Sequence, residues 1–151
     1  MRRGIPCPDF MMRKQVFFPF LRQRGDMDCG AACLGMVCKH YGMAVPLDRL
    51  RDMAGVSHDG ASMAGLAEAA ERLGFVTQGV RMRYDRLIHK PLPAVAHWQG
   101  RHFIVLFRVT PETVWVADPA LGIRKLSREA FEAGWSGVAL LLMQPFAASD
   151  V

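Results

Sequence analysis

Cys29 is the strongest candidate for a catalytic side chain in this sequence. It follows Asp28 and precedes Gly30, at the start of a pattern typical of a helix. Peptide dipoles and free N–H groups at a helix N-terminus stabilise a thiolate, and those N–H groups can also hold the oxyanion of a tetrahedral intermediate. Its position makes Cys29 a candidate nucleophile, although a lone cysteine is more commonly buried and inert.

A nucleophilic cysteine needs a histidine as general base, and two of the five histidines lie on a predicted strand pair. Gln99-Gly100 separates two strand-like segments and predicts a two-residue hairpin loop. In that hairpin His97 pairs with His102, and both rings lie on one face. Geometry does not choose between them, but His102 leads the apolar run 103–106 and would be held more rigidly.

A third group must orient the histidine. Asp118 ends the apolar run 114–117 and precedes a proline. If the turn at 110–112 holds three residues, Asp118 is a diagonal neighbour of His102 on the same face. A two-residue turn would place it on the other face, so the spacing permits this partner without requiring it.

The cysteines also raise the question of a zinc site. Cys29, Cys33, Cys38 and His40 are all potential ligands, but only Cys29 and Cys33 share a face of the predicted helix. No paired Cys-x-x-Cys motif and no second cluster follows, so we predict no metal. Three cysteines so close on one helix are also badly placed for disulfides, which indicates free thiols in a reducing compartment.

The elements that must position these groups fall into two parts. Three helices are predicted first, at 29–41, 47–54 and 62–73. Strands follow at 75–80, 93–98, 102–109, 114–117, 123–126 and 137–143, with a short helix at 127–133. Helices followed by antiparallel strands predict an α+β fold, with an N-terminal helical subdomain packed on a C-terminal sheet.

Composition narrows the class of protein. The 151 residues are 51% hydrophobic and 22% charged, which is typical of one globular domain. No apolar run approaches the roughly 18 residues of a membrane helix, and the first residues do not form a secretory signal. The net charge is +5, with six basic residues before position 25, but no nucleic-acid recognition motif is present.

Several motifs together resemble a known family. The segment 23–34, continuing to Tyr41-Gly42, resembles the bacteriocin-processing cysteine peptidase domain at the N-terminus of peptidase-containing ABC transporters. The stretch 55–75, the run 102–106, Asp118-Pro119 and the segment 131–142 continue the resemblance. It spans about residues 17–143, nearly the whole chain.

The resemblance implies a papain-like fold and a Cys-His-Asp triad at Cys29, His102 and Asp118. It also implies that Gln23 donates a side-chain N–H to the oxyanion. The implied reaction is cleavage after a Gly-Gly pair that ends an amphipathic leader peptide. The peptidase itself would need no cofactor, and ATP would serve only a fused or partner ATPase domain.

The resemblance further implies partners and a location. The precursor peptide would pass to the membrane and ATPase domains of an ABC transporter, in cis or in trans. The peptidase would lie on the cytoplasmic side of the bacterial inner membrane, or in the cytoplasm if it stands alone. We expect a flexible basic arm at 1–16, the peptidase domain at 17–143, and a tail or linker at 144–151.

Substrate contacts and rival functions complete the expectations. We expect Trp98 and Asp28 to contact substrate, with Trp98 narrowing the cleft beside His102 so that only glycine fits. One alternative is a catalytically inactive domain that binds substrate for a secretion ABC transporter. Another is a different papain-like enzyme, such as a transglutaminase or amidase, that uses the same triad.

Overall fold

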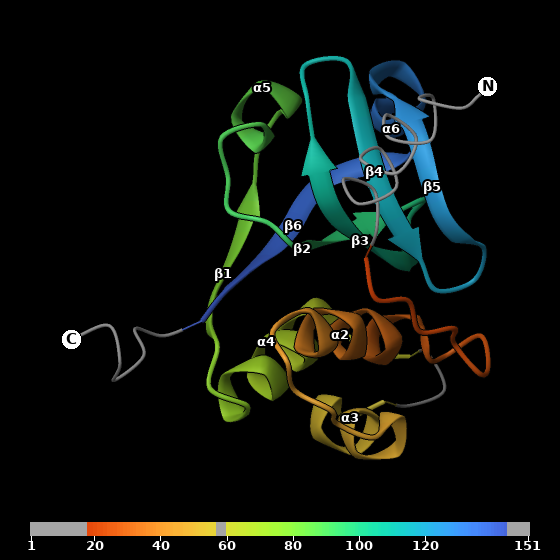
Figure 1. Cartoon of the computed structure of the whole chain (residues 1–151), viewed down its shortest axis with the longest axis vertical. Helices are drawn as coiled ribbons and strands as arrows, with labels where there is room; N and C mark the ends of the chain where they lie inside the picture. Colours follow the sequence, from red (N-terminus) through yellow and green to blue (C-terminus); the bar gives the residue numbers. More distant parts are fainter. Residues whose placement is uncertain (1–17, 57–59, 145–151) are drawn as a thin grey trace, which may run out of the picture.

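A computed structural model of the chain describes residues 18–56 and 60–144. Helices come first and a six-stranded sheet follows, which confirms the predicted α+β class (Figure 1). The described elements are α2 (Cys29–His40), α3 (Leu47–Ala54), α4 (Met63–Arg72), β1 (Val76–Arg81), α5 (Tyr84–Leu87), β2 (Ala94–Trp98), β3 (His102–Val109), β4 (Thr113–Asp118), β5 (Gly122–Ser127), α6 (Arg128–Gly134) and β6 (Trp135–Met143). The expected arm at 1–16, and all but the first residue of the expected tail, lie outside the described residues.

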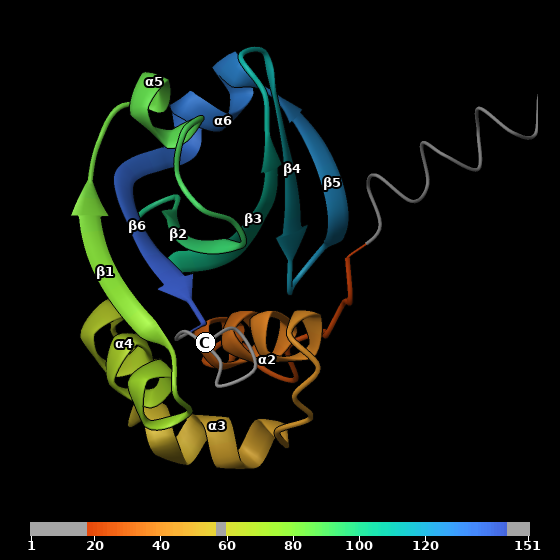
Figure 2. The same cartoon turned by 60° about the vertical axis from the view of Figure 1, so that its left-hand side comes forward.

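The molecule has a helical half, α2 to α4, and a sheet half, β1 to β6 with α5 and α6. Neighbouring strands are antiparallel, in the order β1-β6-β2-β3-β4-β5. The sheet curves strongly, with α2, α3 and α4 at one end and α5 and α6 at the other (Figure 2). One hydrophobic cluster joins α2, α3 and α4 to the sheet, and a second lies under α5 and α6.

Helix α2 is the centre of the helical half because it is apolar on every side. Its residues 29–38 are all buried, and a helix that is apolar all round belongs in a core. Close packing needs its small residues: a Cβ on Gly35 would lie 2.7 Å from Leu21 Cδ2 and 3.1 Å from Leu50 Cδ1. The predicted helix is confirmed to within one residue, including its left-handed exit at Gly42, where φ is +83°.

The hairpin that carries His102 differs from our prediction. Its loop holds three residues, 99–101, so that Trp98 pairs with His102 and His97 pairs with Phe103. Gln99 and Gly100 both adopt positive φ, 51° and 84°. A shift of one residue moves every side chain of a strand to the other face. The prediction that His97 and His102 share a face was therefore wrong.

The pairing of β3 with β4 also has an irregular register. Val109 pairs with Val114, so four residues separate the first paired positions of the two strands, one more than the three-residue turn that would place Asp118 beside His102. An extra residue, Phe107, then bulges from β3, and Val105 pairs with Ala117. The bulge restores the register in which Asp118 lies on the side of His102. The four-residue helix α5 was not predicted, since so short a turn leaves no periodic pattern.

Candidate active site

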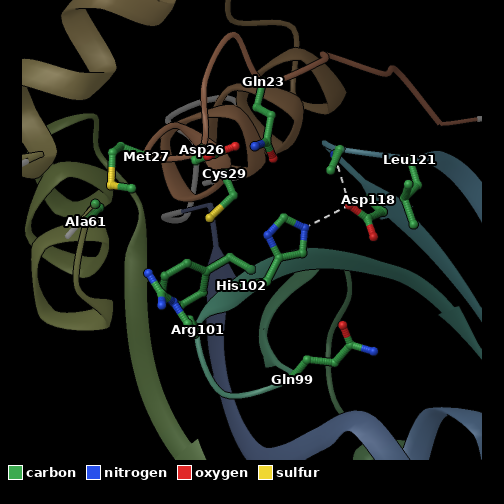
Figure 3. A pocket seen from close by; sticks show the side chains of 13 residues that line it. Gln23, Asp26, Met27, Cys29, Ala61, Gln99, Arg101, His102, Asp118 and Leu121 are labelled. Carbon is green, nitrogen blue, oxygen red and sulfur yellow. Dashed lines mark hydrogen bonds and ion pairs between the residues drawn. The ribbon is translucent and has the colours of Figure 1, made fainter. Parts of the chain in front are cut away.

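A cavity of about 540 Å³ opens where the start of α2 faces the start of β3 and the end of β4. Gln23, Cys29, His102 and Asp118 all line it, so the structure brings together the four side chains predicted to carry chemistry (Figure 3). They come from both halves of the molecule. The cavity therefore lies at the junction of the two halves, where substrate-binding clefts commonly form.

Cys29 is the first residue of α2 and is only 7% exposed. Its sulfur points from the helix end toward the ring of His102 (Figure 3). The N-terminal turn of the helix presents free N–H groups and the positive end of the helix dipole to this sulfur. Both features stabilise a thiolate and suit a nucleophile.

Asp118 holds the imidazole of His102 from the opposite side. The Nε2–H of His102 donates to Asp118 Oδ1 at 2.8 Å, and the Ala120 N–H donates to the same oxygen at 2.9 Å. Burial by itself would raise the pKa of Asp118, but these hydrogen bonds and the charge of His102 outweigh it and lower the pKa. An ionised carboxylate only accepts hydrogen bonds, so Nε2 carries a hydrogen and Nδ1 is the ring nitrogen on the side of Cys29.

His102 is cationic at neutral pH. Burial opposes its protonation, but hydrogen bonds and charges from Asp118 and Cys29 outweigh burial and raise its pKa from 6.5 to about 9. The imidazolium therefore lies beside the sulfur, where it attracts negative charge that develops there during the reaction. The geometry is therefore that of a cysteine–histidine pair oriented by a carboxylate.

The neighbouring cysteines have no such environment. Cys33, one turn along α2, is fully buried, and burial followed by the charges of Cys29 and Asp118 raises its pKa well above 9.0. Burial raises the pKa of Cys38 to about 11. Both thiols stay protonated and inert at neutral pH. Within residues 18–56 and 60–144, no group of three or more His, Cys, Asp or Glu side chains is arranged to hold a metal ion.

Gln23 reaches the cavity from the segment before α2. Its backbone N–H donates to the Pro119 carbonyl at 3.0 Å, which ties it to the turn beside Asp118. Its side-chain Nε2 donates one hydrogen to the Gly25 carbonyl at 2.9 Å. A glutamine amide has two such hydrogens, so the second remains for another acceptor. The buried Oε1 has no hydrogen-bond partner, so the Gln23 amide is not fully satisfied by the protein alone.

The two expected substrate-contact residues are placed elsewhere. Trp98 is 5% exposed and stacks on Phe131 in the second cluster, and Gly134 lies so close to its ring that a Cβ there would be 2.7 Å from Trp98 Cη2. Asp28 is 6% exposed, and its Oδ1 lies 2.7 Å from Arg51 Nε. Neither side chain lines the cavity.

Other side chains line the cavity that the sequence analysis missed. They include Met27, Ala61, Arg101 and Leu121. No signal of type or spacing marks them, because each is a loop or element-end residue that the fold alone brings to the site. A second cavity of about 690 Å³ shares Ala61, Arg101 and Phe103 with the first, so the two adjoin.

The chain matches the model of the "Peptidase C39 family" over residues 18–147. It is 38% identical over 139 residues to the colicin V secretion/processing ATP-binding protein CvaB of Escherichia coli, covering 92% of this chain and 20% of that protein. It is also 38% identical over 125 residues to the lactococcin-G-processing and transport ATP-binding protein LagD of Lactococcus lactis subsp. lactis, covering 78% and 18%. The chain thus spans about a fifth of the length of these relatives.

Solved structures agree with these matches. A double glycine motif protease from an AMS/PCAT transporter, in complex with the leader peptide, superposes with a TM-score of 0.82 at 31% identity, over 86% of this chain and 94% of that one. The peptidase domain of Streptococcus ComA gives 0.80 at 26% identity, over 85% and 100%. In the part of this chain that the structure describes, no helix has the length and apolarity needed to cross a membrane.

Proposed function

The chain belongs to the peptidase C39 family of cysteine peptidases, and we propose that its cavity cuts the leader from exported peptide precursors directly after a Gly-Gly pair. The observation that carries this proposal is the meeting of Cys29, His102 and Asp118 in one open cavity. The match to a double glycine motif protease supports the choice of cleavage site.

Each step of the proposed reaction has a group in place. The Cys29 thiolate attacks the carbonyl carbon of the second glycine, and the Cys29 N–H and the free Gln23 amide hydrogen hold the oxyanion. His102 gives its Nδ1 proton to the leaving amine, whose departure leaves a thioester. His102 then takes a proton from water, and the hydroxide hydrolyses the thioester to release the leader and restore the thiolate.

The leader would lie in the second cavity, beyond the reacting carbonyl. That cavity combines the apolar side chains of Met63, Phe103 and Val138 with the basic side chains of Arg81 and Arg101, and among residues 18–56 and 60–144 no carboxylate lines it. An amphipathic leader can place its apolar face against the first set, and an acidic side chain near the arginines gains charge complementarity.

The length of the relatives supports a role beside a transporter. Relatives about five times longer are named as processing and transport ATP-binding proteins. The chain would therefore act with the membrane and ATPase domains of an ABC transporter, in cis or in trans, on the cytoplasmic side of the inner membrane. Residues 17–143 would form the peptidase, which uses no cofactor, between a basic arm at 1–16 and a tail or linker at 144–151.

Cut-site mapping tests the proposal. The chain is incubated with synthetic precursors whose amphipathic leader ends in Gly-Gly, and mass spectrometry should find one cut, after the second glycine. Cys29→Ala should bind the uncut precursor and release no product, whereas Cys33→Ala, one turn along the same helix, should cut normally. Turnover in Cys29→Ala, or a product of amide exchange in place of hydrolysis, would end the peptidase proposal.

A further inference from the structure

Two buried carboxylates lie next to the reacting groups. Within residues 18–56 and 60–144, the buried charged residues are Asp118 and Asp28, which are 3% and 6% exposed as whole residues. Asp118 orients His102, but Asp28 has no part in the proposed reaction although it directly precedes Cys29. A buried charge is costly unless it is paired, so the place of Asp28 needs a physical reason.

Asp28 holds the N-cap position of α2 without capping it. Its side chain accepts no hydrogen bond from the helix, and its Oδ1 pairs instead with Arg51 Nε at 2.7 Å. The two atoms form an ion pair, but their angles do not meet those of a hydrogen bond. The Asp28 main chain still starts the helix, because its carbonyl accepts from the Ala32 N–H at 2.9 Å. The ion pair therefore holds the residue to which Cys29 is attached.

Arg51 reaches Asp28 from a fixed position. It lies on α3, whose buried residues Leu47, Leu50 and Ala54 pack into the first hydrophobic cluster beside α2 (Figure 2). Its side chain is 43% exposed and the Asp28 side chain only 8%. Water can therefore solvate the arginine if the pair is broken, but not the carboxylate. Loss of Arg51 would leave an uncompensated buried negative charge beside the nucleophile.

That charge would oppose the thiolate. An unpaired carboxylate at the helix N-terminus offsets the positive end of the helix dipole that would otherwise stabilise the sulfur. Its negative charge also repels a thiolate. We propose that Arg51 is a positioning residue that neutralises and holds Asp28, so that the N-terminal turn of α2 presents a reactive Cys29 thiolate to His102. This inference rests on the role of Cys29 as nucleophile in the proposed function.

Alkylation of Cys29 by iodoacetamide, followed by mass spectrometry, is the first readout and needs no peptide substrate. The kinetics of precursor cleavage are the second readout. R51M should slow alkylation about tenfold, the effect of one uncompensated charge near the sulfur, and should lower kcat similarly with KM within about twofold. R51M/D28N should regain most of both rates, because no unpaired buried charge remains at position 28. R24M is the matched control, since Arg24 and Asp48 pair at 3.3 Å between the same segment and α3 but are 64% and 72% exposed.

These measurements distinguish charge neutralisation by Arg51 from a merely structural tether. Wild-type alkylation in R51M, equal slowing in R24M, or a double variant as slow as R51M would overturn the inference, because a merely structural tether predicts no rescue. If R51M does not fold, R51Q replaces it, since its amide can still hydrogen-bond Asp28 without charge. Slow alkylation of R51Q supports the inference, and a wild-type rate overturns it. Failure to cut Gly-Gly precursors would leave these alkylation rates unaffected, so the two proposals fail independently.

Discussion

The helical half and the sheet half supply the site by different physical routes. Cys29 is placed by local signals, because the residues around it already indicate where the helix begins and that it ends before Gly42. His102 and Asp118 are placed by registers between strands, which depend on a three-residue loop and on a bulge at Phe107. The nucleophile therefore follows from local sequence, whereas its partners follow only from the completed sheet.

The largest effect should come from the two histidines of the hairpin, which distinguish the observed register from the predicted one. His102→Ala should lower kcat by about 10³-fold or more, because it removes the general acid and base. His97→Ala should leave kcat within about twofold, because the side chain of His97 lies on the face of the sheet opposite to that of His102. The Nδ1 atom of His97 lies 3.1 Å from Ser136 Oγ instead. Equal losses in kcat for the two variants would contradict the observed register.

Prediction from sequence succeeded where the information is local. Ser62 and Ser127 were expected to start helices, and each accepts a hydrogen bond from the backbone N–H three residues on. The strands were also found, but not their registers, because a loop with positive φ at Gln99 and a bulge at Phe107 leave no distinctive residue pattern. The choice of His102 over His97 therefore needed the structure or the resemblance.

A smaller effect should come from Asp118, the carboxylate that orients His102 within the sheet half. Activity should fall as pH rises through about 9, because the raised pKa of His102 keeps the imidazolium present below that value. Asp118→Asn removes a hydrogen bond to a carboxylate and its charge, so this alkaline limb of kcat/KM should move to lower pH. At neutral pH the rate should fall roughly a hundredfold, at the lower end of the usual range of acid–base catalysis.

Asp26→Asn is the control for that measurement. Asp26 lines the same cavity but is exposed and is not hydrogen-bonded to His102. Its alkaline limb should coincide with that of the unmodified chain. An unmoved limb in Asp118→Asn would show that the carboxylate does not set the protonation of His102.

The smallest effect compares one glycine from each half, and it concerns stability. Alanine normally stabilises a helix interior by about 1 kcal/mol relative to glycine. In α4, however, a Cβ on Gly65 would collide with the backbone carbonyl of Ala54, at the end of α3. Overpacking of this kind costs about 1–3 kcal/mol, so Gly65→Ala should lower the free energy of unfolding in urea titrations.

Gly79→Ala is the control from the sheet half. A Cβ at this position of the edge strand β1 would meet no atom within 4 Å, so the free energy of unfolding should change by less than about 0.5 kcal/mol. A stabilised Gly65→Ala variant would mean that α3 and α4 can move apart, and that the helical half tolerates rearrangement where this close packing predicts rigidity.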